Sequence, residues 1–306
     1  MNILITGATG FIGSHLCRAL LKRNYEVFAL SHSEKIERIA PLLSHGHFHL
    51  VRGEICSLPI MREIMESSKI DAVIHLAAHI TYGSQEAIDN LAHLENNLKG
   101  TLVVLQSCVS AGISKVIYVS SRDVYGVPEY LPMDENHPQK PLNFYSLTKL
   151  QGESYCQFYA QNYHLHVVVL RYAGVYGPGK NRGLVYNSIQ AVLRGQLPQI
   201  SSDGNQTRDL VYVGDVVEAT IKALDVLDKI TFDVFNVGSG RETSANELLS
   251  KIIQISGAHI DFRYVPATSD DRFVLDITKA RRVLGYQPRP IDNGLEEFTQ
   301  ILRSGE

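Results

Sequence analysis

Short runs of apolar, mainly β-branched residues alternate with longer amphipathic stretches through the first half of the chain. Six of these runs predict β-strands, at residues 2–6, 26–30, 48–51, 72–75, 116–119 and 166–170. The segments 12–22, 85–111 and 144–162 are each long enough to form a helix between strands. Strands that alternate with helices in this way form a parallel sheet with both faces covered. The pattern therefore predicts an α/β protein with a Rossmann-like, doubly wound sheet.

After about residue 170 this alternation loosens, and Gly and Pro clusters such as Tyr176-Gly177-Pro178-Gly179 separate short, mixed elements. We expect a dinucleotide-binding Rossmann domain over residues 1–172 and a smaller, mainly substrate-binding lobe over residues 173–306. Segments within about 207–238, such as 210–213 and 234–237, are expected to return to the main sheet. We find no internal repeat and no flexible linker.

The composition is that of a globular protein. The 306 residues are 44% hydrophobic, and 29 basic and 32 acidic residues leave a net charge of -3. This balance argues against nucleic-acid and membrane partners, which require a basic surface. The first residues lack the features of a signal peptide, and no apolar run approaches the roughly 20 residues that span a bilayer. We therefore expect a soluble, cytoplasmic protein. The four cysteines form no C-x-x-C pair, so neither disulfides nor a zinc site are expected.

A glycine-rich turn follows the first predicted strand and opens the first predicted helix. It reads Thr6-Gly7-Ala8-Thr9-Gly10-Phe11-Ile12-Gly13, with glycines spaced G-x-x-G-x-x-G. The first glycine permits a tight turn, the second a close approach of a pyrophosphate, and the third close packing of helix on strand. In this context the motif predicts that a nicotinamide dinucleotide binds at Gly7, Gly10, Phe11, Ile12 and Gly13.

The second predicted strand ends without the acidic residue that usually binds the adenosine ribose hydroxyls. The sequence there is Phe28-Ala29-Leu30-Ser31-His32-Ser33. A neutral Ser31 followed by the basic His32, Lys35 and Arg38 would accommodate a 2′-phosphate better than a carboxylate would. This favours NADP(H) over NAD(H), with the alternative that Lys35 and Arg38 are simply solvated helix charges.

Tyr145 and Lys149 are four residues apart in a predicted helix, so their side chains share one face. A neighbouring ammonium favours the phenolate and so lowers the pKa of a tyrosine from its reference value of about 10, which suits acid–base catalysis. Upstream, Ser120 and Ser121 follow a strand and would lie at the carboxyl edge of the sheet, where ligands bind in open α/β folds.

With these motifs the chain resembles an extended short-chain dehydrogenase/reductase of the NAD-dependent epimerase/dehydratase family, which acts mainly on nucleotide-activated sugars. The resemblance covers almost the whole length. Further matching segments are Arg52-Gly53-Glu54-Ile55, His75-Leu76-Ala77-Ala78, Asn97-Leu98-Lys99-Gly100-Thr101, Arg171 to Gly179, Arg208 to Asp215, Phe235-Asn236-Val237-Gly238, Asp276-Ile277-Thr278-Lys279-Ala280 and Leu284-Gly285-Tyr286-Gln287-Pro288.

The resemblance implies a role for each matching position. Tyr145 would be the catalytic acid/base, Lys149 would hold the nicotinamide ribose and lower the tyrosine pKa, and Ser121 would hydrogen-bond the reacting sugar oxygen. Asn97 would support the site from the neighbouring helix. Glu54 and Ile55 would lie at the adenine, with Glu54 in place of the usual Asp, while Leu76, Ala77 and Ala78 would line the cofactor path.

Departures from the family pattern concern the substrate. The 4,6-dehydratases carry Asp-Glu after the catalytic Thr, whereas Arg122-Asp123 stands here, which disfavours dehydration. Gly174 replaces the Asn that usually contacts the sugar or diphosphate. Arg208 matches the arginine that grips the diphosphate, with a salt bridge to Asp209 or Asp215 as the alternative. The predicted substrate contacts are Ser121, Arg122, Asp123, Tyr82, Gly174, Arg182, Arg208 and Arg272.

Two reactions at C4 of the sugar would use the same residues. A 4-ketoreductase delivers hydride from exchangeable NADPH, and a 4-epimerase removes and returns hydride with tightly bound NAD. The missing ribose acid favours the 4-ketoreductase. A reductase of a non-sugar carbonyl and a non-catalytic dinucleotide sensor are further alternatives.

Two remaining expectations concern metal ions and assembly. His45, His47 and His49 alternate along a predicted strand entry, but no carboxylate or cysteine beside them in the sequence completes a metal site, so no metal is expected. The family resemblance implies a homodimer formed by the helix that carries Tyr145 and the helix that precedes Ser121.

Overall fold

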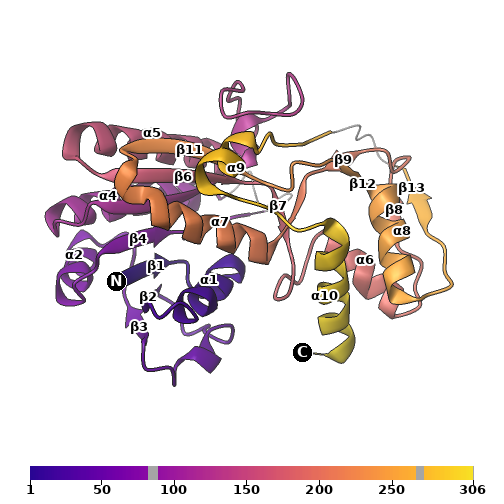
Figure 1. Cartoon of the computed structure of the whole chain (residues 1–306), viewed down its shortest axis with the longest axis horizontal. Helices are drawn as coiled ribbons and strands as arrows, with labels where there is room; N and C mark the ends of the chain where they lie inside the picture. The colour runs from indigo at the N-terminus through magenta and orange to yellow at the C-terminus, as the bar shows by residue number, and fades with distance from the viewer. Residues whose placement is uncertain (82–88, 267–271, 306) are drawn as a thin grey trace. The chain divides into compact units, whose positions relative to one another are not determined.

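The computed structural model of the chain describes residues 1–81, 89–266 and 272–305 (Figure 1). It divides into two compact units. The first comprises Met1–Gly126, Pro138–Arg171 and Val217–Phe235, and the second comprises Val127–His137, Tyr172–Val216 and Asn236–Glu306. The first unit is therefore not one continuous stretch up to residue 172, because residues 127–137 belong to the second unit.

A seven-stranded sheet forms the centre of the first unit, in the order β11-β6-β5-β4-β1-β2-β3. Its strands are β1 (Asn2–Thr6), β2 (Glu26–Ser31), β3 (Phe48–Arg52), β4 (Ala72–His75), β5 (Lys115–Ser121), β6 (His166–Tyr172) and β11 (Phe232–Val237). The pairs β1–β2, β2–β3, β1–β4 and β4–β5 are all parallel. The strand order reverses between β1 and β4, and ligands of such sheets bind at the carboxyl ends of the strands at this point. The predicted Rossmann-like fold is confirmed.

Helices cover both faces of this sheet. They are α1 (Phe11–Leu21), α2 (Leu58–Ser67), α3 (Asn90–His93), the π-helical segment η3 (Leu94–Lys99), α4 (Gly100–Ser110), α5 (Phe144–Tyr163) and α7 (Val213–Val226). Buried side chains of α2, α4 and α5 pack with Leu4, Val73 and Val167 of the strands into one apolar core. On the other face lie α1 and residues 217–226 of α7 (Figure 1). Arg23, just after α1, forms an ion pair of 2.7 Å with Glu218 of α7.

The helix ends agree closely with the hydrophobic pattern, with one addition. The segments predicted at 12–22 and 144–162 form α1 and α5. The described part of the segment predicted at 85–111 is helical from Asn90 to Ser110, but η3 interrupts it with a π-helical turn. Hydrophobic periodicity did not indicate this turn, and π-helical turns often occur at functional sites.

The second unit contains short strands in pairs. These are β7 (Gly174–Tyr176) with β10 (Leu210–Tyr212), β9 (Thr207–Arg208) with β12 (Thr243–Ser244), and β8 (Gln199–Ser201) with β13 (Arg263–Val265). Its helices are α6 (Leu184–Leu193), α8 (Ala245–Ser256), α9 (Thr278–Leu284) and α10 (Ile291–Ser304). Within the described residues, short 3₁₀ turns are η1 (Ala40–Leu42), η4 (Arg122–Tyr125) and η5 (Leu227–Lys229).

One prediction about these segments is wrong. Residues 234–237 do join the main sheet within β11, but residues 210–212 pair with β7 instead. The amide of Gly174 donates to the carbonyl of Asp209 at 3.0 Å, at the start of this pair. A Cβ at position 174 would lie 3.0 Å from the same oxygen, so the glycine permits the close approach of the two strands.

Candidate active site

The glycine-rich turn has the backbone geometry that close approach of a phosphate requires. Gly7 has a φ of +73°, and its carbonyl accepts a hydrogen bond from the amide of Gly10 at 3.0 Å. A Cβ at position 13 would lie 2.2 Å from the Gly7 oxygen, and a Cβ at position 7 would lie 2.8 Å from the amide nitrogen of Ala77. Helix α1 begins at Phe11, and its N-cap Gly10 provides no side-chain cap. This compact turn and helix N-terminus fit a dinucleotide pyrophosphate.

The residues predicted for the adenosine end lie at the ends of β2 and β3. Ser31 is the last residue of β2 and is buried, while His32 and Lys35 are exposed. Ile55 is buried and Glu54 is exposed just beyond β3. The register pairs Ser31 with Arg52, the last residue of β3. Sequence reasoning treated Arg52 only as part of a family motif and did not assign it to the cofactor site.

A chain of buried hydrogen bonds connects β1 with the π-helical segment. Thr6 Oγ1 accepts from the amide of Ala77 at 3.2 Å and lies 2.6 Å from His75 Nδ1. His75 Nε2 lies 3.0 Å from Thr101 Oγ1, which donates to the carbonyl of Asn97 at 2.5 Å. Burial lowers the pKa of His75 to about 3, and the charge of Lys149 adds to this effect. The imidazole is therefore neutral, and the order of donors assigns its proton to Nε2.

Asn97 lies in η3 and is almost completely buried. Its Oδ1 accepts from the amide of His79 at 2.6 Å, and its Nδ2 donates to the carbonyl of the same residue at 3.0 Å. Nδ2 also donates to Thr148 Oγ1 at 3.1 Å, and Thr148 donates in turn to the carbonyl of Tyr145 at 2.8 Å. Asn97 thus connects the loop after β4 to the first turn of α5.

Tyr145 and Lys149 both lie on α5, and a capping box of Asn143 and Ser146 defines the start of this helix. Tyr145 is half-buried, whereas Lys149 is buried and its Nζ donates to the carbonyl of Val119 at 2.7 Å. Burial lowers the pKa of Lys149 to about 8, although the charges of Cys156 and Glu153 raise it. A buried ammonium is therefore held against β5, two residues before Ser121.

Ser121 ends β5, and its hydroxyl is part of a local cluster. Its Oγ donates to Asp123 Oδ2 at 3.1 Å and accepts from the amide of Asp123 at 3.2 Å, which caps η4. Arg122 Nη2 lies 3.1 Å from Asp123 Oδ1. The carboxylate of Asp123 therefore accepts from the Ser121 hydroxyl and pairs with a cation, and the acid–base pair of a dehydratase is not present at these positions.

Sequence reasoning missed a buried ionic network behind this strand end. Glu153, one turn after Lys149 on α5, accepts from Ser120 Oγ at 2.5 Å and from Arg171 Nη2 at 2.6 Å. Arg171 Nη1 donates to the hydroxyl of Tyr125 at 2.9 Å, and its guanidinium carbon lies 4.8 Å from the centre of that ring. Lys149 and Glu153 thus bind two consecutive residues of β5 from one face of α5, which positions the strand end beside Ser121.

The remaining predicted substrate contacts lie in the second unit. The guanidinium of Arg208 lies 5.1 Å from the ring centre of Phe273 and donates to the carbonyl of Thr207 at 2.8 Å. Arg272 forms an ion pair of 2.6 Å with Glu242. Arg182 is exposed in the loop between β7 and α6, and Gly174 begins β7. Tyr82 lies outside the described residues.

Asp209 and Asp215, the acids that the sequence offered as partners of Arg208, both have other contacts. Asp209 is buried and accepts hydrogen bonds from the amide and hydroxyl of Ser239 at 2.6 and 2.7 Å and from the amide of Leu275 at 3.1 Å. Burial raises the pKa of Asp209, while these hydrogen bonds lower it. Asp215 pairs with Arg289 at 2.9 Å. Asp209 therefore organises the loops around Arg208.

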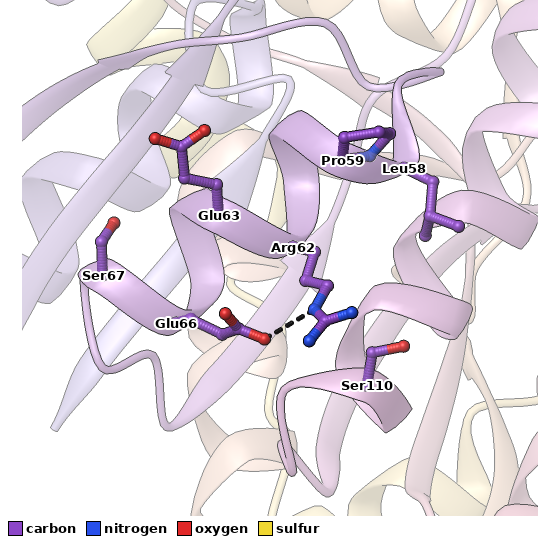
Figure 2. Close-up of a pocket in the computed structure, with 7 residues that line it drawn as sticks. All are labelled: Leu58, Pro59, Arg62, Glu63, Glu66, Ser67 and Ser110. Carbon is purple, nitrogen blue, oxygen red and sulfur yellow. Dashed lines mark hydrogen bonds and ion pairs between the residues drawn. The ribbon is translucent and has the colours of Figure 1, made fainter.

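A cavity of about 720 Å³ lies elsewhere in the first unit, on α2 and the end of α4 (Figure 2). Arg62 and Glu66, which form an ion pair of 2.7 Å on α2, line it together with Ser67 and Ser110 (Figure 2). The lining residues extend along the whole of α2, from Leu58 to Ser67, and include the last residue of α4. None of the predicted site residues lines it, and we assign no catalytic role to it.

The described residues contain no group of three or more His, Cys, Asp or Glu side chains arranged to hold a metal ion. Within the same ranges, no helix combines the length and apolar character needed to cross a bilayer.

Comparison with known proteins gives consistent matches over the whole chain. The family model described as NAD dependent epimerase/dehydratase family matches residues 3–238. A putative UDP-glucose 4-epimerase of Methanocaldococcus jannaschii is 36% identical, and the match covers 94% of this chain and 93% of the length of that protein. The UDP-glucose 4-epimerase of Bacillus subtilis is 30% identical, and the match covers 97% of this chain and 94% of the length of that protein. The UDP-glucuronic acid 4-epimerase of Bacillus cereus, solved with UDP-glucuronic acid and NAD, has a TM-score of 0.89 at 31% identity and covers 100% of both chains.

Proposed function

The chain belongs to the NAD-dependent epimerase/dehydratase family, an NAD(P)-dependent class of enzymes, and we propose on this premise that it is a nucleotide-sugar 4-epimerase. The observation that carries the proposal is the arrangement of Tyr145 and Lys149 on one face of α5, with Lys149 held against the strand that ends at Ser121. The relatives that match over the full chain include several 4-epimerases.

In the proposed reaction the side chains transfer the proton, and the hydride chemistry belongs to the cofactor. When bound, the nicotinamide ring would supply reversible hydride exchange with either face of C4 of the sugar. The Tyr145 oxygen takes the proton of the C4 hydroxyl and returns it to the same oxygen in the reverse step. The ammonium of Lys149, one helical turn away, favours the phenolate that accepts this proton. The hydroxyl of Ser121 hydrogen-bonds the reacting oxygen and keeps it near Tyr145.

The same residues would serve a 4-ketoreductase, which is the reaction that the sequence favoured through Ser31. The relatives support the epimerase better, because most of them are 4-epimerases and solved structures among them hold NAD. They support NAD as a cofactor and give no support to a preference for NADP(H). The dehydratase reaction has least support, since Arg122 stands where that reaction needs an acid and pairs with Asp123.

The proposed substrate is a UDP-activated sugar, because the matching 4-epimerases act on UDP-glucose or UDP-glucuronic acid. Arg208 is the proposed diphosphate contact, since a guanidinium can bind two phosphate oxygens at once. Its contact with the ring of Phe273 restricts its orientation. Arg272, already paired with Glu242 at 2.6 Å, is the weaker candidate for this role.

The reaction is tested by incubating the purified chain with UDP-glucose or with UDP-galactose and following the anomeric protons by NMR. We expect both sugars to reach the same equilibrium mixture without added reductant. Tyr145→Phe should lower the rate by about 10²- to 10⁴-fold. The control Tyr155→Phe removes a hydroxyl from the same helix and should leave the rate unchanged. One-way reduction of a 4-keto sugar that consumes NADPH would favour the 4-ketoreductase instead.

We also propose that two copies of the chain assemble through α5 and the helical segment that precedes Ser121, which comprises α3, η3 and α4. Leu91 of α3 is 79% exposed and Phe158 of α5 is 52% exposed, so both helices present a large apolar side chain that a second copy would cover. Light scattering on the purified chain should give the mass of a dimer, and Phe158→Asp should shift it toward the monomer. A monomeric wild-type protein would reject this assembly.

A further inference from the structure

The loop after β2 lies where Rossmann proteins recognise the adenosine ribose. A carboxylate at the end of the second strand normally accepts hydrogen bonds from the ribose hydroxyls and repels a 2′-phosphate. Here the residue is Ser31, which is only 4% exposed. Its hydroxyl donates to the carbonyl of Ser33 at 2.8 Å and accepts from the amide of the same residue at 3.3 Å. The strand end therefore presents no negative charge, and its hydroxyl is engaged within its own loop.

Two guanidinium groups contact this loop from different elements. Arg52 ends β3 as the register partner of Ser31, and it donates to the carbonyl of Ser33 and to Glu34 Oε2 at 3.0 Å. Arg18 on α1 donates to the carbonyl of Arg38 at 2.5 Å and to that of Ser14 at 3.3 Å. Both hydrogen bonds of Arg18 are thus made to backbone carbonyls. The side chain of Arg52, in contrast, is 41% exposed and accessible to a ligand in solution.

The present partner of Arg52 is easily replaced. The side chain of Glu34 is 93% exposed, and exposed ion pairs contribute little to stability because water screens them. A phosphate dianion carries more charge than a carboxylate and matches the guanidinium with two parallel hydrogen bonds. The exposed Lys35, in the same loop, adds a second cation on this side. A phosphate could therefore take the place of Glu34 without breaking any buried contact.

We propose that Arg52 binds the 2′-phosphate of NADP(H), so that this chain accepts NADP(H) with an affinity within tenfold of that for NAD(H). The inference rests on dinucleotide binding at the turn of residues 7–13 and is independent of the sugar. It is compatible with epimerisation, because hydride returns to the cofactor that removed it and the 2′-phosphate takes no part in the chemistry. It identifies Arg52, which lies outside the glycine-rich motif, as a specificity-determining residue.

The test is isothermal titration calorimetry on the full chain, freed of copurifying nucleotide, with two matched pairs of probes. NADP⁺ and NAD⁺ differ only in the 2′-phosphate, and so do 2′,5′-ADP and 5′-AMP. Arg52→Gln should weaken binding of NADP⁺ and 2′,5′-ADP at least tenfold, the loss of one charged hydrogen-bonding partner, and should change binding of NAD⁺ and 5′-AMP less than twofold. Ser31→Asp should also weaken the binding of NADP⁺ selectively, because it places a carboxylate at the end of β2 that repels the 2′-phosphate.

The matched control is Arg62→Gln, which removes another exposed, Glu-paired arginine from the same unit, at the cavity on α2. It should leave all four affinities unchanged. A wild-type protein that binds NADP⁺ more than tenfold more weakly than NAD⁺ would overturn the proposal. An unchanged ratio of the two affinities in Arg52→Gln would overturn it equally. Failure of the proposed sugar reaction is distinguishable, because it would leave these binding measurements intact.

Discussion

The buried ion pair between Glu153 and Arg171 allows a quantitative test of how the active-site strand is supported. The side chains are 6% and 2% exposed, so neither charge has access to water. Burial alone lowers the pKa of Arg171, but hydrogen bonds and the charge of Glu153 more than offset this and raise it. Glu153→Gln keeps the shape of the side chain and removes the charge, which leaves a buried guanidinium without a counter-ion.

Removing the charge of one partner of a buried ion pair lowers the free energy of unfolding by about 3–5 kcal/mol. This is a large part of the roughly 5–15 kcal/mol by which proteins are stable. With a denaturant dependence of about 3 kcal/mol per molar urea, the unfolding midpoint should fall by about 1–1.7 M. The measurement is urea unfolding followed by circular dichroism.

Two controls separate this effect from a general loss of packing. Glu153→Gln combined with Arg171→Met removes both charges and should recover most of the stability, because replacing a whole buried pair with uncharged side chains is often nearly neutral. Glu66→Gln breaks the exposed pair with Arg62 and should cost less than about 1 kcal/mol. If Glu153→Gln alone costs less than about 1 kcal/mol, or if the double variant is the less stable of the two, the reasoning is refuted.

Three further predictions follow from single positions. Gly13→Ala places a Cβ 2.2 Å from the Gly7 oxygen, so calorimetry should show at least a tenfold loss of dinucleotide affinity; unchanged affinity would contradict the assigned turn. The pKa of Lys149 falls to about 8 on folding, so the unfolded chain binds more protons between about pH 8 and 10.5. Stability should therefore rise with pH in this window, and Lys149→Met should abolish this part of the rise. Gly152→Ala brings a Cβ to 2.2 Å from the hydroxyl oxygen of Tyr118. Thermal unfolding should therefore show that the free energy of unfolding falls by about 1–3 kcal/mol. An unchanged melting temperature would show that α5 can move away from β5.

The strands and helices of the first unit could be predicted from local pattern. Runs of β-branched residues correspond to β1 to β6, and the ends of α1 and α5 lie within a residue of the predicted ones. The pairing of β10 with β7 could not be predicted, because three-residue strands carry too little pattern to specify a partner. The π-helical turn at Asn97 could not be predicted either, since a single such turn within a helix is too short to change the apolar periodicity.

The candidate site divides in the same way. The spacing of Tyr145 and Lys149 and the three glycines of the turn are short-range features, and short-range geometry follows directly from the periods of helices and turns. The sequence by itself therefore determined the fold class and predicted the dinucleotide turn and the proposed catalytic pair. Only the tertiary structure placed Arg52 beside Ser31 and Arg171 beside Glu153, because these pairs are 21 and 18 residues apart on different elements. Their contacts depend on strand register and on packing of helix against sheet, which the local pattern of polar and apolar residues does not encode.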